Sequence, residues 1–320
     1  MTHVLALDIG GTKLAAGVVD DAGKVAGFQA APTMNHEGPD PVIARLFALA
    51  RRALRAAPGP PVAAVGIACG GPLDGRRGVI MSPPNLPGWD RVPIGPLAEA
   101  EFGVPFVLLN DATAAAWGEY RFGAGRGPRS MIYLTVSTGV GGGAVVGGRL
   151  HTGTTGNGGE FGHVMVRPGG RACRCGRVGC LEAYASGTSI AERADERVRR
   201  GEATVLAGDE PLTSAAVASA ARAGDRLAAE VWDEATRCLG DALTDFVNVF
   251  EPGIVVLGGG VTRAGEQLLG PVRAIVERNA ISPAVLSYAS AGEAAGVVGA
   301  GAVALDYMSA GPHQELRLGR

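Results

Sequence analysis

Short apolar runs separated by glycine-rich turns open the chain. The first run ends at Asp8, and a Gly-Gly-Thr turn leads into a second run over residues 13–19. An Asp-Asp-Ala-Gly turn and a third run follow, so the pattern predicts a three-stranded β-meander. Residues 41–57 carry apolar side chains at helical spacing up to a Pro-Gly-Pro-Pro breaker, which predicts an amphipathic helix.

A later stretch of the chain repeats this order. The apolar segment PFVLLN runs into Asp111 and is followed by a helical pattern over residues 112–123. The segment MIYLTVSTGVGGGAVVGGRL then gives an apolar run, a small polar residue, a glycine-rich turn and another apolar run, about 130 residues after the first. This echo predicts an α/β protein built from two similar halves.

Three more helices are predicted in the second part of the chain. Residues 227–250 carry a long helical pattern, the strand-and-turn segment IVVLGGG follows, and another helix runs to about residue 279. The glycine-dense segment 294–305 predicts a closely packed final helix. Residues 151–182, which follow the second of these repeats, are irregular and rich in glycine, histidine and cysteine, so we expect them to need an external clamp.

Composition limits the classes of partner. The 320 residues are enough for two domains, and 29 basic against 31 acidic residues leave a net charge of −2, which disfavours nucleic acid. The longest apolar run, at 294–305, is too short to cross a bilayer, and no signal-like segment opens the chain. We therefore expect a cytoplasmic protein whose 51 glycines serve turns that approach a small molecule.

The segment Asp8–Lys13 ends a strand with a carboxylate and follows it with two glycines. Backbone N–H groups in such a turn bind phosphate, although a plain tight hairpin has the same signature. The second glycine turn, at residues 137–143, favours the phosphate interpretation, because two such turns suit the ends of one polyphosphate.

Asn110 and Asp111 lie where a buried strand meets a helix. Either side chain suits a helix N-cap, but a carboxylate at the carboxyl end of a strand in an α/β protein is also where a hydroxyl nucleophile would meet its base. We favour the catalytic interpretation for Asp111.

His163, Cys173, Cys175 and Cys180 have the composition of a closed zinc site. One imidazole and three thiolates fill all four tetrahedral positions, which predicts a structural zinc rather than a catalytic one; unrelated free cysteines are the alternative. A loop fixed in this way would present Glu160 and Glu182 to the vicinal hydroxyls of a sugar, unless both are ordinary surface glutamates.

With these motifs in place, the sequence resembles the ROK family of sugar kinases, within the actin-like ATPase superfamily. The resemblance covers nearly the whole chain and rests on six motifs in order: DIGGTK, LLNDATAAAWGE, STGVGGG, GGEFGH, CRCGRVGCLE and VVLGGG. It implies a two-lobed, ribonuclease H-like fold with duplicated mixed sheets, flanking helices and a cleft. The lobes would be residues 1–110 with about 290–320, and residues 111–290 with the zinc-bound sugar loop.

The resemblance also implies site roles by position. The nucleotide would be bound by two phosphate loops and a turn under the adenosine, which comprise Asp8, Gly10, Gly11, Thr12 and Lys13, then Thr138, Gly139, Val140 and Gly141, and Gly258, Gly259 and Gly260. The sugar would be held by Gly71, Asn110, Asp111, Glu160, His163 and Glu182, with Asn85 as a further contact. His163 would serve both zinc and sugar.

The implied activity is phosphorylation of a hexose at its 6-hydroxyl by ATP and Mg²⁺, with Asp111 as the base and glucose as the first candidate. An N-acylhexosamine kinase is the alternative within the enzymes, and a sugar-sensing regulator without catalysis is the alternative outside them. Polyphosphate is a second possible donor, and the family implies a homodimer or homotetramer.

Overall fold

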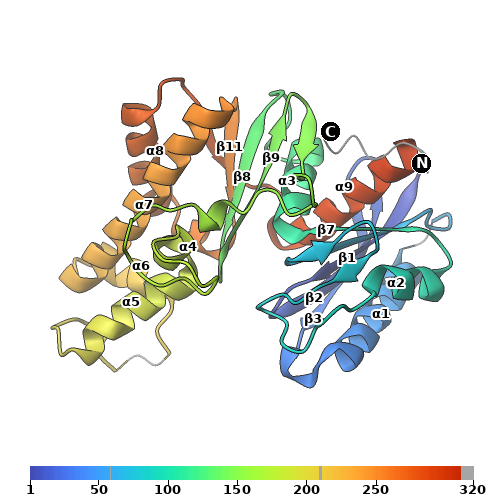
Figure 1. The fold of residues 1–320 in the computed structure, drawn as a ribbon, viewed down its shortest axis with the longest axis horizontal. Helices are drawn as coiled ribbons and strands as arrows, with labels where there is room; N and C mark the ends of the chain where they lie inside the picture. Colours follow the sequence, from blue (N-terminus) through green and yellow to red (C-terminus); the bar gives the residue numbers. More distant parts are fainter. Residues whose placement is uncertain (58, 209–210, 311–320) are drawn as a thin grey trace. The chain divides into compact units, whose positions relative to one another are not determined.

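The computed structural model describes residues 1–57, 59–208 and 211–310, which form two compact units of strands and helices (Figure 1). Among the described residues, the first unit comprises 1–127, 143–159 and 289–310, and the second comprises 128–142 and 160–288. Residues 311–320, which the sequence analysis placed in the returning segment, lie outside the described residues.

The first unit is built on a five-stranded mixed sheet. Its order is β3-β2-β1-β4-β7, formed by β1 (His3–Ile9), β2 (Lys13–Asp20), β3 (Val25–Pro32), β4 (Val65–Cys69) and β7 (Phe106–Asn110). The first three strands pair antiparallel, which confirms the predicted meander, and β1, β4 and β7 run parallel. The carboxyl ends of β1, β4 and β7 therefore meet at one edge of the sheet.

A second five-stranded sheet repeats this order. It runs β10-β9-β8-β11-β12, with β8 (Met131–Val136), β9 (Val140–Val146), β10 (Arg149–His151), β11 (Ile254–Gly258) and β12 (Val285–Tyr288). Three successive strands are again followed by two strands parallel to the first, since β11 pairs parallel with both β8 and β12. The predicted duplication is thus confirmed in the strand order.

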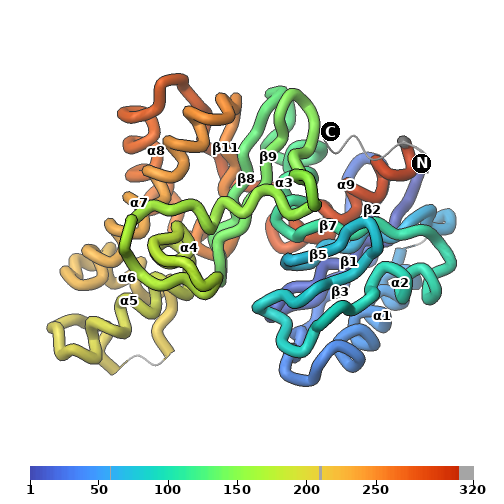
Figure 2. The backbone as a smooth tube through the Cα atoms, in the orientation of Figure 1, coloured from blue at the N-terminus to red at the C-terminus, as the bar shows by residue number. Residues whose placement is uncertain are grey.

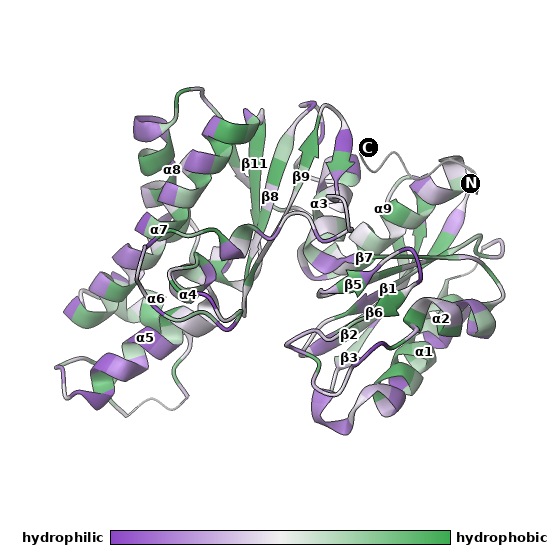
Figure 3. Cartoon of the chain, viewed as in Figure 1, coloured by the Kyte–Doolittle hydropathy of each residue, from purple (hydrophilic) through white to green (hydrophobic). Residues whose placement is uncertain are grey.

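Helices cover both sheets, and the larger helices of the second unit carry both hydrophilic and hydrophobic residues (Figure 3). The described helices are α1 (Pro39–Ala56), α2 (Ile94–Phe102), α3 (Asp111–Phe122), α4 (Glu182–Ala185), α5 (Gly187–Arg199), α6 (Ser214–Arg222), α7 (Arg226–Phe250), α8 (Glu266–Asn279) and α9 (Ala295–Ala310). A short hairpin of β5 (Leu73–Asp74) and β6 (Val79–Ile80) completes the strands. Within the described ranges, no helix is both long and apolar enough to cross a membrane.

Helix α9 returns the chain to the first unit and packs against α3, β1 and β4. Glycines allow this packing, because a Cβ on Gly299 would lie 2.4 Å from the Ala114 carbonyl carbon, and a Cβ on Gly66 would lie 2.0 Å from the Ala300 oxygen. The predicted close-packed final helix is therefore confirmed, with backbone against backbone.

A buried carboxylate on α3 fixes the segments through which the chain leaves and re-enters the first unit. Glu119 is 1% exposed, and it accepts hydrogen bonds from the N–H groups of Ala124, Ser290 and Ala291, each at 2.8 Å. The Ser290 hydroxyl donates a fourth at 3.1 Å. These bonds compensate the desolvation of the charge.

Candidate active site

The turn between β1 and β2 is a tight glycine hairpin. The Gly10 N–H donates to the Lys13 oxygen at 2.9 Å, and the Thr33 hydroxyl donates to the Gly10 oxygen at 2.6 Å. A Cβ on Gly11 would lie 2.9 Å from the Asn85 Cβ, so the loop that carries Asn85 packs directly on the turn. Thr12 at the tip is exposed. The hairpin geometry is therefore present, and it leaves the tip open to a ligand.

Asp8 precedes this turn and lies against the first turn of α9. A Cβ on Gly296 would fall 2.3 Å from the Asp8 carboxylate, so only glycine leaves room there. Burial first, and then the charge of Asp111, raise the pKa of Asp8 from 3.8 to about 7, although the charge of Lys13 lowers it in part. Two carboxylates in this edge of the sheet thus repel each other, which is an arrangement that a divalent cation relieves.

The sequence allowed either Asn110 or Asp111 to cap the following helix, and in the structure Asn110 is the cap. The Asn110 side-chain oxygen caps α3, because it accepts from the Ala112 and Thr113 N–H groups at 3.0 and 3.1 Å. A ligand would therefore meet its NH₂ group. Asp111 Oδ1 accepts from the Ala112 N–H at 2.7 Å, and burial raises the pKa of Asp111 above 3.8. Its carboxylate is thus held at the sheet edge with a raised proton affinity, as a general base requires.

The edge of the first unit near Gly71 is fixed by a residue that sequence reasoning missed. Asn157 Oδ1 accepts from the Leu73 N–H at 3.2 Å, and its Nδ2 donates to the Leu73 oxygen at 3.3 Å. Gly71 itself is half-buried, two residues before this contact. The sequence signal for this contact is the Gly-Asn-Gly segment around Asn157, but the segment does not reveal its partner Leu73, which is 84 residues away in the chain.

In the second unit the turn between β8 and β9 is the other predicted phosphate loop. The Ser137 N–H donates to the Gly139 oxygen at 2.8 Å, and Thr138 is exposed at the tip. Gly141 is half-buried in β9. The Val140 N–H donates to Glu182 Oε2 at 2.9 Å, so the turn is held by the carboxylate that follows the cysteine segment. One oxygen of Glu182 is therefore occupied within the protein.

A pocket of about 840 Å³ lies beside this turn. Its walls come from Ser137 and Thr138, from α5, from residues 211–214, and from Gly260 and Val261 after β11. Gly258 ends β11 in a buried position, and Gly259 has φ +91°, with only 2.4 Å from its would-be Cβ to the Val136 oxygen. The sequence identified the glycine turns but missed α5 and residues 211–214, because their side chains carry no motif.

The sulfur and nitrogen ligands of the predicted metal site do come together. The candidate ligand atoms of His163, Cys173, Cys175 and Cys180 all lie within 4.8 Å of one another. Cys173 Sγ is 3.7 Å from His163 Nδ1, and Cys175 Sγ is 3.7 Å from Cys180 Sγ. A tetrahedral zinc with bonds of about 2.3 Å to sulfur would place two sulfurs roughly 3.8 Å apart, so the donor set fits.

Two isolated antiparallel bridges, Met165 with Cys180 and Ala172 with Val178, connect parts of the cysteine segment. Figure 2 shows the backbone of this segment as an irregular tube around α4. Burial raises the pKa of the Cys173 thiol to about 12, so a bound cation would be needed to hold its thiolate.

The remaining predicted sugar contacts surround this cluster. Glu160 Oε2 lies 3.8 Å from His163 Nε2, and Glu182 Oε1 lies 3.9 Å from Cys173 Sγ. The structure thus brings Glu160, His163 and Glu182 together in the second unit, while Gly71, Asn110 and Asp111 belong to the first unit.

Comparisons with known proteins agree with these motifs. The profile of the ROK family matches residues 4–307. A glucokinase from Streptomyces coelicolor is 36% identical over 312 residues, which cover 94% of this chain and 96% of that protein. An N-acetylmannosamine kinase from Citrobacter koseri is also 36% identical, over 94% of this chain and 98% of its own.

Two solved structures are similar in fold and sequence. A ROK hexokinase from Thermus thermophilus has a TM-score of 0.82 at 39% identity and covers 97% of this chain and 100% of its own. A ROK glucokinase from Streptomyces griseus in complex with glucose and AMPPNP has a TM-score of 0.81 at 36% identity, over 95% and 100% of the two chains. The duplicated sheets, the ordered glycine turns and the His/Cys cluster share one explanation with these matches, which is that the chain belongs to the ROK family.

Proposed function

We propose that this protein is a glucokinase, which transfers the γ-phosphoryl group of ATP to the 6-hydroxyl of glucose. The observation that carries the proposal is the placement of Asp111. Its carboxylate has a raised pKa, lies at the end of a parallel strand, and shares its sheet edge with the first glycine turn. Glucokinase relatives that match over nearly the whole chain support glucose as the acceptor.

In the proposed reaction Asp111 accepts the proton of the 6-hydroxyl as the hydroxyl oxygen bonds to the γ-phosphorus. The bond from that phosphorus to the β–γ bridging oxygen breaks, and ADP leaves with the electron pair. Backbone N–H groups at the exposed tips of the turns, around Thr12 and Thr138, would orient the phosphates, and the pocket of about 840 Å³ would hold the nucleoside.

Two metals have different roles in this proposal. Asp8 would hold Mg²⁺, which would neutralise part of the phosphate charge, and the mutual repulsion of Asp8 and Asp111 is consistent with a cation at that edge. Zn²⁺ in the His163 and cysteine cluster supplies only structure, because protein ligands fill all four positions.

A panel of sugars tests the function. ADP release with ATP and Mg²⁺ is measured for glucose, mannose, fructose, N-acetylglucosamine and N-acetylmannosamine, and we expect the highest kcat/KM for glucose. Preference for an N-acetyl sugar would favour the second candidate, an N-acylhexosamine kinase, for which the match to the Citrobacter koseri enzyme is the specific support. Absence of turnover with every sugar would favour a sugar-sensing regulator, and replacing ATP by polyphosphate tests the donor.

A further inference from the structure

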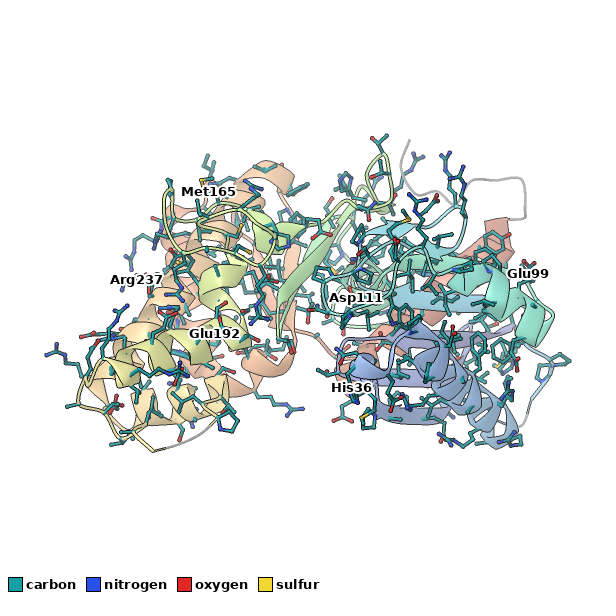
Figure 4. All side chains as sticks on the ribbon, turned by 60° about the horizontal axis from the view of Figure 1, so that its bottom comes forward. His36, Glu99, Asp111, Met165, Glu192 and Arg237 are labelled. Atoms are coloured by element: carbon teal, nitrogen blue, oxygen red, sulfur yellow. The ribbon has the colours of Figure 1, made fainter. Side chains whose placement is uncertain are left out.

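Side chains of the cysteine segment contact the helix that lines the nucleotide pocket. Arg171 forms two hydrogen bonds to Glu196 on α5, at 2.8 and 2.5 Å. Arg174, which lies between two cysteines of the cluster, donates to Glu192 Oε1 at 2.6 Å. Glu192 belongs to the pocket wall and lies on α5 (Figure 4). The segment that would hold the metal is therefore connected to one wall of the pocket.

A second connection runs through Glu182, two residues after Cys180. Its Oε1 lies 3.9 Å from Cys173 Sγ, and its Oε2 accepts the Val140 N–H at 2.9 Å. A Cβ on Gly139 would fall 2.6 Å from the same Oε2, so glycine permits the contact. One half-buried carboxylate thus touches both the metal cluster and the second glycine turn.

The start of α5 closes the connection. The Gly187 N–H donates to the Ser137 oxygen at 2.7 Å, and a Cβ on Gly187 would lie 2.9 Å from that oxygen. Ser137, Thr138 and Gly187 all line the pocket. The glycine turn, the start of α5 and the cysteine segment therefore form one continuous set of contacts within the second unit.

We propose that the metal cluster positions the nucleotide side of the site as well as the sugar side, with Glu182 as the positioning residue between them. This inference rests on the proposed function for the identity of the nucleotide. It makes metal occupancy and nucleotide affinity linked quantities, since a metal bound by Cys180 fixes the start of α4, where the Ala183 N–H donates to the Cys180 oxygen. Glu182 at that start, and with it the glycine turn, is then fixed before the nucleotide arrives. Linkage is reciprocal, so bound nucleotide must also retain the metal.

Glu182 rather than the arginine pairs carries the coupling, because the pair of Arg171 with Glu196 ends at a residue that is not among those lining the pocket, and the pair of Arg174 with Glu192 is exposed. The side chains of Arg174 and Glu192 are 65% and 49% exposed, and ion pairs as exposed as these contribute little in water. The bond from the Val140 N–H to Glu182 is partly buried and charge-assisted, which places it among the stronger hydrogen bonds.

The test measures nucleotide binding without sugar, so that the expected sugar contact of Glu182 has no effect. AMPPNP affinity is determined by calorimetry for the zinc-loaded protein and after chelation. We expect chelation to weaken binding by about tenfold in the wild type, which corresponds to about 1.4 kcal/mol of coupling. Glu182→Ala should bind about tenfold more weakly even with zinc, and chelation should weaken it no further.

Glu182→Gln is the matched control, because its amide oxygen can still accept the Val140 N–H. It should keep most of the coupling. The reciprocal measurement follows the rate of zinc transfer to a chelating dye, which AMPPNP should slow in the wild type but not in Glu182→Ala. This second readout remains informative if the chelated protein loses its fold.

The possible failures are distinguishable. If the zinc-loaded wild type does not bind AMPPNP, the proposed function is wrong. If it binds AMPPNP, but with an affinity that is the same with and without zinc, or if Glu182→Ala keeps the full coupling, only the further inference is overturned.

Discussion

Asp8 and Asp111 are two carboxylates at the edge of the first sheet, and their burial determines how strongly each binds a proton. Burial disfavours the ionised form, so the pKa values of Asp8 and Asp111 are both raised. A general base benefits from this shift, because a carboxylate with higher proton affinity accepts a hydroxyl proton more readily. The two predictions at the residue scale follow from the two shifts.

We expect Asp111→Asn to lower kcat by about 10²–10⁴-fold while hexose binding remains measurable, because the amide cannot accept the proton. The wild type should lose kcat/KM as pH falls through the raised pKa of Asp111, since protonation removes the base. Rate profiles between pH 4 and 9, with titration of the hexose by calorimetry, check both statements. Near-normal turnover of the variant would exclude Asp111 as the base.

Asp8→Asn should stabilise the metal-free protein at high pH. The folded-state pKa of about 7 exceeds the unfolded value of 3.8, so the folded state binds more protons between these values and loses stability as pH rises through that window. The variant lacks this loss, and we expect its advantage in urea unfolding to grow by about 4 kcal/mol from pH 4 to pH 8. An advantage that stays constant with pH would contradict the assignment.

At the scale of whole elements, helices α3 and α9 pack closely because Gly299 of α9 has no side chain. Gly299→Ala would place a methyl group 2.4 Å from the Ala114 carbonyl carbon, so we expect a loss of about 3 kcal/mol in the free energy of unfolding. Gly270→Ala in α8 is the matched control, because its Cβ meets Glu266 Oε2 at an ordinary 3.6 Å and alanine favours a helix. It should gain about 0.5–1 kcal/mol. Urea unfolding of both variants decides, and equal effects would refute the packing argument.

The helices, strands and turns could be predicted from the sequence, but the contacts between residues far apart in the chain could not. The meander, the paired glycine turns and the gathering of His163 with Cys173 follow from local patterns, because strand periodicity, turn residues and the spacing of candidate ligands are local properties. The α5 wall of the pocket and the contact of Asn157 with Leu73 depend on residues far apart in sequence. The bond from the Val140 N–H to Glu182 was missed for the same reason, since it joins residues 42 positions apart.

At the scale of the whole molecule, the His/Cys cluster lies in only one of the two units, the second. Chelation should therefore raise hydrogen exchange in peptides covering 160–182, which carry the four candidate ligands and no long helix or strand, and leave the strands of the first unit unchanged. Exchange followed by mass spectrometry with and without chelator measures this. Equal loss of protection in residues 3–20 would contradict a structural metal confined to the second unit.

The return of α9 to the first unit also sets an order of assembly during synthesis. The side chains of Val297, Ala304 and Leu305 are buried, and α9 packs against β1, which is made well before it. On the ribosome, the sheet of the first unit must therefore wait until α9 has emerged, while the strands of the second sheet, all within residues 131–288, have already been made. The turn after β1 therefore becomes complete only when α9 has been made, so a chain interrupted before α9 has a folded second unit while Asp8 still lacks its packing against Gly296.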